Sequence, residues 1–141
     1  MANASPAKKL TDAVHGLSEA TRWGQLDNAM RMVEPTYRNK FLQQHREWGS
    51  GIQVADAEVV ILEMSPDHES ATAVLAYQWY LYDNMSLRQT VVRQIWTLNQ
   101  GGYGLMAERI VQGDPRLFDT NAPESAAPTA SVRLLGDPTD Y

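Results

Sequence analysis

The sequence predicts an α+β domain in which helices come first and a four-stranded antiparallel sheet follows. Apolar residues recur at helical spacing as far as Trp48, whereas they alternate at every second position after Gly51. Short turn sequences separate the alternating segments, so neighbouring strands are expected to pair as hairpins. With 141 residues and no cysteine, the chain is long enough to bury a core without disulfide bonds.

Three consecutive helices are expected before the sheet. Ser5 and Pro6 begin the first, because serine is a good N-cap and proline fits the first helical turn. Gly24 is suited to end it. A short second helix precedes Pro35, which cannot lie deep inside a helix. A third helix follows and is stopped by the glycines that begin at Gly49.

The alternating half of the chain contains four segments with strand character. Both faces of the second and third segments carry bulky apolar side chains. One face should therefore cover the helices, and the other should form a cupped interior or a contact surface for another subunit. The four expected strands are residues 52–64, 71–82, 87–98 and 103–111.

The composition changes after the last expected strand. We expect an ordered domain over residues 5–111 and a Pro/Ala/Asp-rich tail over residues 112–141. Such a composition is typical of chain with little regular structure. The few apolar residues of the tail should make local contacts with the domain or with a partner.

The charge balance disfavours some classes of partner. The formal net charge is −5 and the sequence pI is about 5.1, so a phosphate backbone would be repelled on average and nucleic-acid binding is not expected. No apolar run approaches the length of a spanning helix. We expect a soluble protein, either cytoplasmic or exported after removal of a leader that this sequence does not contain.

Four local segments form a recognisable pattern: Arg22-Trp23-Gly24, Gly24-Gln25-Leu26-Asp27, Pro35-Thr36-Tyr37-Arg38 and the Gly-Gly turn before Tyr103. In these segments the sequence resembles the NTF2-like superfamily, which has a cystatin-like α+β fold. The resemblance implies N-terminal helices packed on a curved four-stranded antiparallel sheet that forms a cone, as in the uncharacterised pocket proteins of the superfamily. Three helices run here before any strand, and no acid–base pair matches an enzyme motif, so no catalytic residue is transferred.

Three residues are candidates for acid–base chemistry. His45 shares the apolar face of its helix, where it would be either a proton shuttle or a hydrogen-bonded structural histidine. Asp56 points to the same face as Glu58, as a functional carboxylate pair or as the solvent side of an edge strand. Tyr77 joins an aromatic segment that suits a pocket or a core. No pair of metal-ligand spacing is present, and no cofactor is expected.

Aromatic residues are the candidates for ligand contact. The residues expected to line a ligand pocket are Tyr37, Phe41, Tyr77, Trp79 and Trp96.

Two arginines of the third expected strand, Arg88 and Arg93, point to opposite faces. One of them should therefore point inward and pair with Glu58 or Glu108.

These observations favour a non-enzymatic domain. It would bind a small apolar ligand in the cone between helices and sheet, or it would serve as a protein-assembly module. The outer face of the sheet is expected to support a homodimer. The alternatives are a pocket enzyme of the isomerase or dehydratase type that uses His45, Asp56 or Tyr77, and an exported accessory lipoprotein.

Overall fold

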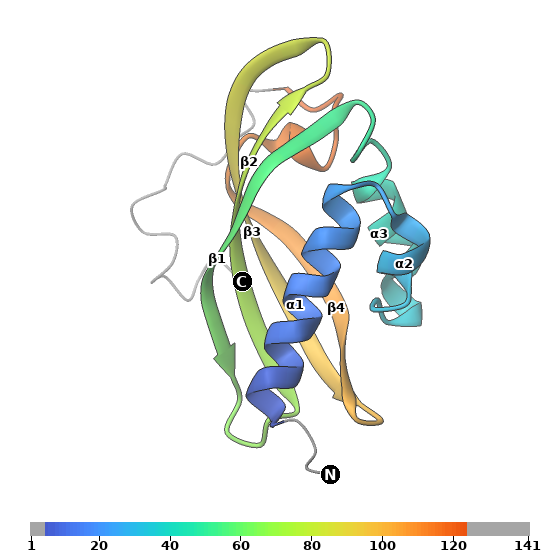
Figure 1. The fold of residues 1–141 in the computed structure, drawn as a ribbon, viewed down its shortest axis with the longest axis vertical. Helices are drawn as coiled ribbons and strands as arrows, with labels where there is room; N and C mark the ends of the chain where they lie inside the picture. Colours follow the sequence, from blue (N-terminus) through green and yellow to red (C-terminus); the bar gives the residue numbers. More distant parts are fainter. Residues whose placement is uncertain (1–4, 124–141) are drawn as a thin grey trace.

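The computed structural model describes residues 5–123, which form one antiparallel sheet covered on one face by helices (Figure 1). Helix α1 (Pro6–Arg22) lies along the inner face of the sheet, and α2 (Leu26–Met30) and α3 (Arg38–His45) lie beside it on the β4 side. A 3-10 turn, η1 (Pro35–Tyr37), leads into α3. The strands are β1 (Ile52–Met64), β2 (Ser70–Leu81), β3 (Asn84–Asn99) and β4 (Gly102–Gly113). The predicted fold class is confirmed.

Helix α1 begins and ends where the sequence indicated. The Ser5 side chain accepts a hydrogen bond from the Lys8 backbone N at 3.2 Å, which satisfies one of the free donors of the first turn. Leu10, Val14 and Leu17 form its buried stripe. No helix within residues 5–123 is long and apolar enough to cross a membrane.

Two glycines bring the end of α1 against the end of α3. Gly24 has a φ of 71° and Gly49 a φ of 85°, which are conformations that other residues rarely adopt. A Cβ atom on Gly49 would lie 2.8 Å from the Gly24 Cα. The close approach of these two backbone segments therefore requires glycine at both positions.

The sheet is a meander in the order β1-β2-β3-β4, as predicted from the hairpin turns. The pairing register shifts at two places between β1 and β2, at one between β2 and β3, and at two between β3 and β4. Bulges bend and twist strands locally. They account for the curvature that lets the sheet wrap around α1 (Figure 1).

The free edge of β4 is covered by the chain that precedes α3. Glu34 N donates to Leu105 O at 2.9 Å, and Leu105 N donates to Met32 O at 2.7 Å. These bonds form a short parallel bridge at Val33. They place η1 and α3 directly against β4, which sets the geometry of the site described below.

Both faces of the sheet carry apolar clusters, as expected from the sequence. The inner face packs on the helices through residues such as Leu75, Tyr77 and Trp79. The outer face has a second cluster that includes Val74 and Val91.

The first residues of the predicted tail belong to this packing. β4 continues to Gly113 and is followed by η2 (Pro115–Leu117). Leu117 is fully buried, and the Trp48 indole Nε1 donates to its carbonyl oxygen at 2.9 Å. The remainder of the predicted tail, residues 124–141, lies outside the described residues.

Candidate functional site

The space between the helices and the sheet is filled by aromatic side chains. Phe41, Tyr77, Trp79 and Trp96 are all buried. The Trp48 ring stacks edge-on against Tyr77 with ring centroids 5.2 Å apart. The predicted ligand-contact residues are thus brought together, but as neighbours in a packed core. Among the five, Tyr37 is the one that lines either of the two cavities described below.

His45 is the centre of a buried polar network. Its side chain is 1% exposed, and its ring lies between those of Phe41 and Trp48, with centroid distances of 4.1 and 4.6 Å. Nδ1 lies 2.9 Å from the Phe41 carbonyl oxygen, and Nε2 lies 3.0 Å from Glu108 Oε1. A carbonyl oxygen can only accept, so Nδ1 must carry a proton.

The contact between His45 and Glu108 is that of a buried ion pair. His45 Nε2 and Glu108 Oε1 lie 3.0 Å apart, and Oε1 makes no hydrogen bond to any described residue. A histidine and a carboxylate that are buried together can form an arrangement without net charge, which burial favours.

The second carboxylate oxygen of Glu108 is also engaged. Gln94 Nε2 donates to Glu108 Oε2 at 2.7 Å, and the Trp96 indole Nε1 donates to Gln94 Oε1 at 3.0 Å. The chain of polar contacts therefore runs from Phe41 through His45, Glu108 and Gln94 to Trp96. Both ring nitrogens of His45 have polar contacts inside the protein.

Tyr37 joins this network to the free edge of β4. The Glu108 backbone N donates to the Tyr37 hydroxyl at 2.9 Å, and that hydroxyl lies 2.5 Å from Gln44 Oε1. Gln44 Nε2 donates to Glu108 O at 3.4 Å, which closes a ring of three groups. Burial and the charge of Glu108 raise the pKa of Tyr37 to about 12. Tyr37 is therefore a neutral hydrogen-bond donor at physiological pH.

The other two acid–base candidates lie elsewhere in the fold. Burial, followed by the charge of Glu108, raises the pKa of Tyr77 well above its ordinary value, so its hydroxyl stays protonated. Asp56 and Glu58 are exposed on β1, at the opposite edge of the sheet from β4. The structure does not bring Asp56 to His45.

The prediction that the inward arginine pairs with Glu58 or Glu108 is wrong. Arg88 is the inward one, and its guanidinium lies 5.9 Å from the centroid of the Trp79 ring. It pairs with Asp114, with Arg88 Nη1 and Asp114 Oδ2 3.0 Å apart. Glu58 is exposed and Glu108 pairs with His45. The role of Asp114 was missed, although its position before Pro115 is typical of a residue that caps a turn.

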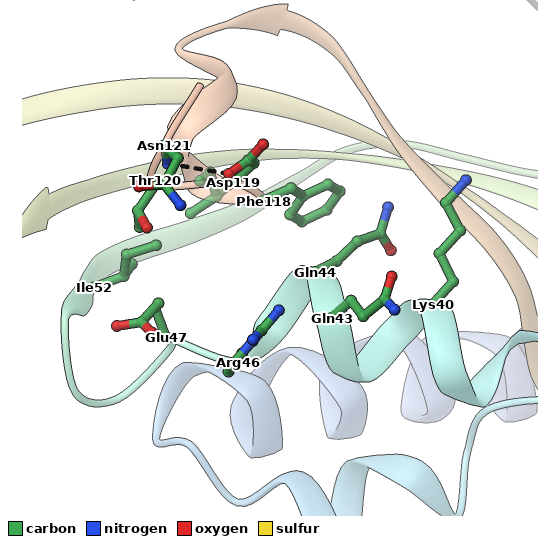
Figure 2. Close-up of a pocket in the computed structure, with 11 residues that line it drawn as sticks. Lys40, Gln43, Gln44, Arg46, Glu47, Ile52, Phe118, Asp119, Thr120 and Asn121 are labelled. Atoms are coloured by element: carbon green, nitrogen blue, oxygen red, sulfur yellow. Dashed lines mark hydrogen bonds between the residues drawn. The ribbon is translucent and has the colours of Figure 1, made fainter. Parts of the chain in front are cut away.

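A first cavity lies between α3 and the chain after η2, and we call it the mouth cavity (Figure 2). Its volume is about 360 Å³. Figure 2 shows Lys40 and Gln44 extending from α3 on one side and Phe118 lying opposite. The Phe118 ring covers His45 at a centroid distance of 5.3 Å. The mouth cavity is thus separated from the buried histidine by Phe118 and Gln44.

A second cavity, which we call the edge cavity, has a volume of about 640 Å³. Tyr37 and Lys40 line it from the α3 side. The strands contribute apolar or weakly polar residues and two arginines, which alternation and pairing place on the outer face of the sheet. Glu108 lines it from β4 while its carboxylate binds His45 and Gln94. The strand residues of the outer face are Thr72, Arg93, Ile95, Ala107 and Arg109.

The edge cavity offers no site for a bound metal. Within residues 5–123, no group of three histidine, cysteine, aspartate or glutamate side chains is positioned to hold an ion. The described residues give the edge cavity a mixed apolar and cationic lining, which is suited to binding.

No family model and no curated protein matches the sequence. Solved structures do match the fold. A SEC-C motif containing protein from Rhodopseudomonas palustris has a TM-score of 0.63 and 13% identity, with 77% of this chain and 83% of that chain covered. An NTF2-like protein from Cytophaga hutchinsonii has a TM-score of 0.57 and 10% identity, with coverage of 76% and 98%.

A protein of unknown function with a cystatin-like fold, from Nostoc punctiforme, has a TM-score of 0.55 and 11% identity, with 82% of this chain and 96% of that chain covered. Identities this low show a shared fold and leave function open. The predicted resemblance is confirmed at the level of the fold: this chain has the NTF2-like, cystatin-like α+β architecture.

Proposed function

We propose that this protein is a non-enzymatic binding domain, and that the edge cavity binds a small molecule with an apolar body. The observation that carries the proposal is the combination of a volume of about 640 Å³ with a lining from two different layers of the fold. Small-molecule sites have volumes of roughly 300–1,000 Å³ and combine apolar walls with a few polar groups.

The lining supplies both kinds of contact. Ile95, Ala107 and the ring of Tyr37 offer apolar surface, and Thr72 offers a hydroxyl. The cone itself is a less suitable place for a ligand, because its aromatic residues already pack against one another. The proposal therefore moves the ligand from the cone, where the sequence led us to expect it, to the outer edge of β3 and β4.

The same geometry argues against an acid–base enzyme. His45 and Glu108 are close enough to transfer a proton, but both histidine nitrogens and both carboxylate oxygens have partners inside the protein. A catalytic base needs a path to substrate. With 1% of the His45 side chain exposed, the pair supports stability in preference to turnover.

The test is binding of the dye Nile red, whose emission rises in apolar surroundings. The intact protein should bind it, and Ala107→Phe, which fills the edge cavity, should abolish binding. Met106→Phe is the matched control, since Met106 is the neighbouring exposed residue of β4 and does not line the cavity. Equal binding by wild type and the folded Ala107→Phe protein would place the dye elsewhere and contradict the proposal.

A second candidate is assembly through the outer face of the sheet. The observation that favours it is Ile95, which is 37% exposed on the outer face, where Ile61 and Ala76 are only partly buried. Sedimentation should then give about twice the monomer mass of 15.8 kDa, and Ile95→Asp should reduce it. A monomeric mass at high protein concentration would reject this candidate.

A further inference from the structure

We infer that the molecule bound in the edge cavity is an anion with an apolar body, such as an alkyl carboxylate. The inference rests on the proposed function and specifies the ligand's charge. Three of the residues that line the cavity are cationic, namely Lys40, Arg93 and Arg109. They meet there although the whole chain has a formal net charge of −5.

Two of these cations face each other across adjacent strands. Arg93 on β3 and Arg109 on β4 are directly paired in the register of the ladder, so their side chains leave the same face of the sheet. Arg93 is buried and already makes interactions of its own, whereas Arg109 is exposed. The charge of this pair that a ligand can reach is therefore that of Arg109.

Lys40 adds a third charge from a different element. It extends from α3 (Figure 2) and lines the edge cavity together with the two arginines. Neither Lys40 nor Arg109 forms an ion pair with any residue between 5 and 123. Their charges are therefore available to a ligand.

The one described acid that lines the cavity does not pair with Lys40 or Arg109. Glu108 turns its carboxylate to the inner face, where His45 Nε2 lies at 3.0 Å and Gln94 Nε2 at 2.7 Å. Guanidinium groups bind carboxylates and phosphates through paired hydrogen bonds. An anionic head group would lie near Arg109 and Lys40, and its alkyl chain would lie over Ile95 and Ala107. Such a ligand matches both the cationic and the apolar residues of the lining.

The experiment compares two ligands of equal length by titration calorimetry on the full chain. Decanoate should bind at least about tenfold more tightly than decanol, since a charged hydrogen bond replaces a neutral one. Raising the salt concentration should weaken decanoate and leave decanol unchanged.

Two exposed cations provide the variants, so folding is not at risk. Arg109→Gln and Lys40→Gln should each weaken decanoate by about tenfold and leave decanol unaffected. Arg31→Gln, which removes an exposed arginine after α2 outside the edge cavity, is the control and should change neither ligand.

The outcomes distinguish binding in the edge cavity from the charge of the ligand bound there. Equal affinity for decanoate and decanol, or decanoate binding that survives both substitutions, would overturn the anion inference while the proposed function stands. Absence of binding by decanoate, decanol and Nile red would remove the proposed function and the inference together. Decanoate that fails to bind a protein sedimenting at twice the monomer mass would assign the outer face to a second copy and overturn the inference.

Discussion

Two neighbouring rungs of the β3–β4 ladder have opposite electrostatic characters. Gln94 pairs with Glu108 and points to the inner face, whereas Arg93 pairs with Arg109 and points to the outer face. The inner rung is complementary, because an amide donates to a carboxylate that also binds His45. The outer rung sets two positive charges opposite each other.

The difference distinguishes the part of the sheet that supports folding from the part where we propose binding. On the inner face, the His45 network is held by hydrogen bonds and by the ion-pair contact between His45 Nε2 and Glu108 Oε1, and partners of this kind are what a buried network needs to be stabilising. On the outer face, a like-charged rung borders a cavity. Sequences depart from local stability rules where function requires it, and the like-charged rung therefore supports the binding site that we propose on the outer face.

The largest loss in the free energy of unfolding is expected from removing Glu108. Glu108→Ala leaves the His45 Nε2 and the Gln94 amide buried without their acceptor, and loss of one member of a buried pair costs about 3–5 kcal/mol. Glu108→Gln keeps an acceptor for Gln94 and a donor for His45, so its cost should be about 1–2 kcal/mol. Urea unfolding measures both. Equal losses for the two variants would show that the carboxylate's partners do not matter.

Tyr37→Phe tests the link between the inner network and the β4 edge. It removes the acceptor of the Glu108 backbone N and the donor to Gln44, and an unsatisfied buried group costs about 1–3 kcal/mol. The variant should also change the alkaline limb of the stability curve. Because the folded pKa of Tyr37 is raised to about 12 from an ordinary value near 10, its stabilisation is complete below about pH 10.

That stabilisation is lost as pH rises from about 10 toward 12, so wild type should lose more stability over this interval than Tyr37→Phe does. Urea unfolding at pH 9 and at pH 11 measures the difference. Tyr77, whose pKa is also raised, is present in both proteins and cancels. Parallel losses in the two proteins would contradict a role for the Tyr37 hydroxyl.

The elements of the fold were predictable, and the partners of the site were not. Helical spacing, proline and glycine positions and two-residue alternation identify the helices and strands from local sequence. A single bulge then changes which side chains meet. Met106 is an extra residue between two consecutive pairs of the ladder, Trp96 with Leu105 and Ile95 with Ala107. It moves Glu108 to the inner face, whereas simple alternation from Leu105 points it outward.

The location of the cavity depends on contacts of the same non-local kind. Tyr37 reaches the β4 edge because residues 32–34 pair with Leu105, and no periodicity in the sequence encodes that bridge. The aromatic residues were correctly grouped, but their number and size are also what a filled core requires. Whether they border a cavity is decided by packing volumes, which a linear pattern does not contain.

A smaller loss of stability is expected on removing the charge of Asp114, which lies between the guanidinium groups of Arg88 and Arg116. Burial alone would raise the pKa of Asp114, but hydrogen bonds and charge from Arg116, with a hydrogen bond from Arg88, outweigh it and lower the pKa. A lowered pKa contributes stability above the unfolded value near 4 that is lost as pH falls further.

Asp114→Asn should therefore cost about 1 kcal/mol at pH 7 and progressively less as pH falls below 4. Thermal unfolding at pH 7 and pH 3 measures the difference. A loss of stability that is the same at pH 7 and pH 3 would mean that the charge of Asp114 does not stabilise its contacts with Arg88 and Arg116.

The smallest expected change is a gain in the free energy of unfolding, not a loss. Arg109→Glu places a negative charge opposite Arg93 in the ladder. An opposite-charge pair across two strands contributes about 0.2–1 kcal/mol to the stability of a sheet. The variant should be slightly more stable than wild type at low salt, and the gain should shrink at high salt because exposed charges are screened. Arg31→Glu, outside the sheet, should not share the gain. The same variant should bind decanoate more weakly than wild type, so a residue that costs stability would be shown to serve binding. Loss of stability in Arg109→Glu would instead mean that Arg109 is already matched to its surroundings, and the contrast between the two rungs would no longer separate folding from function.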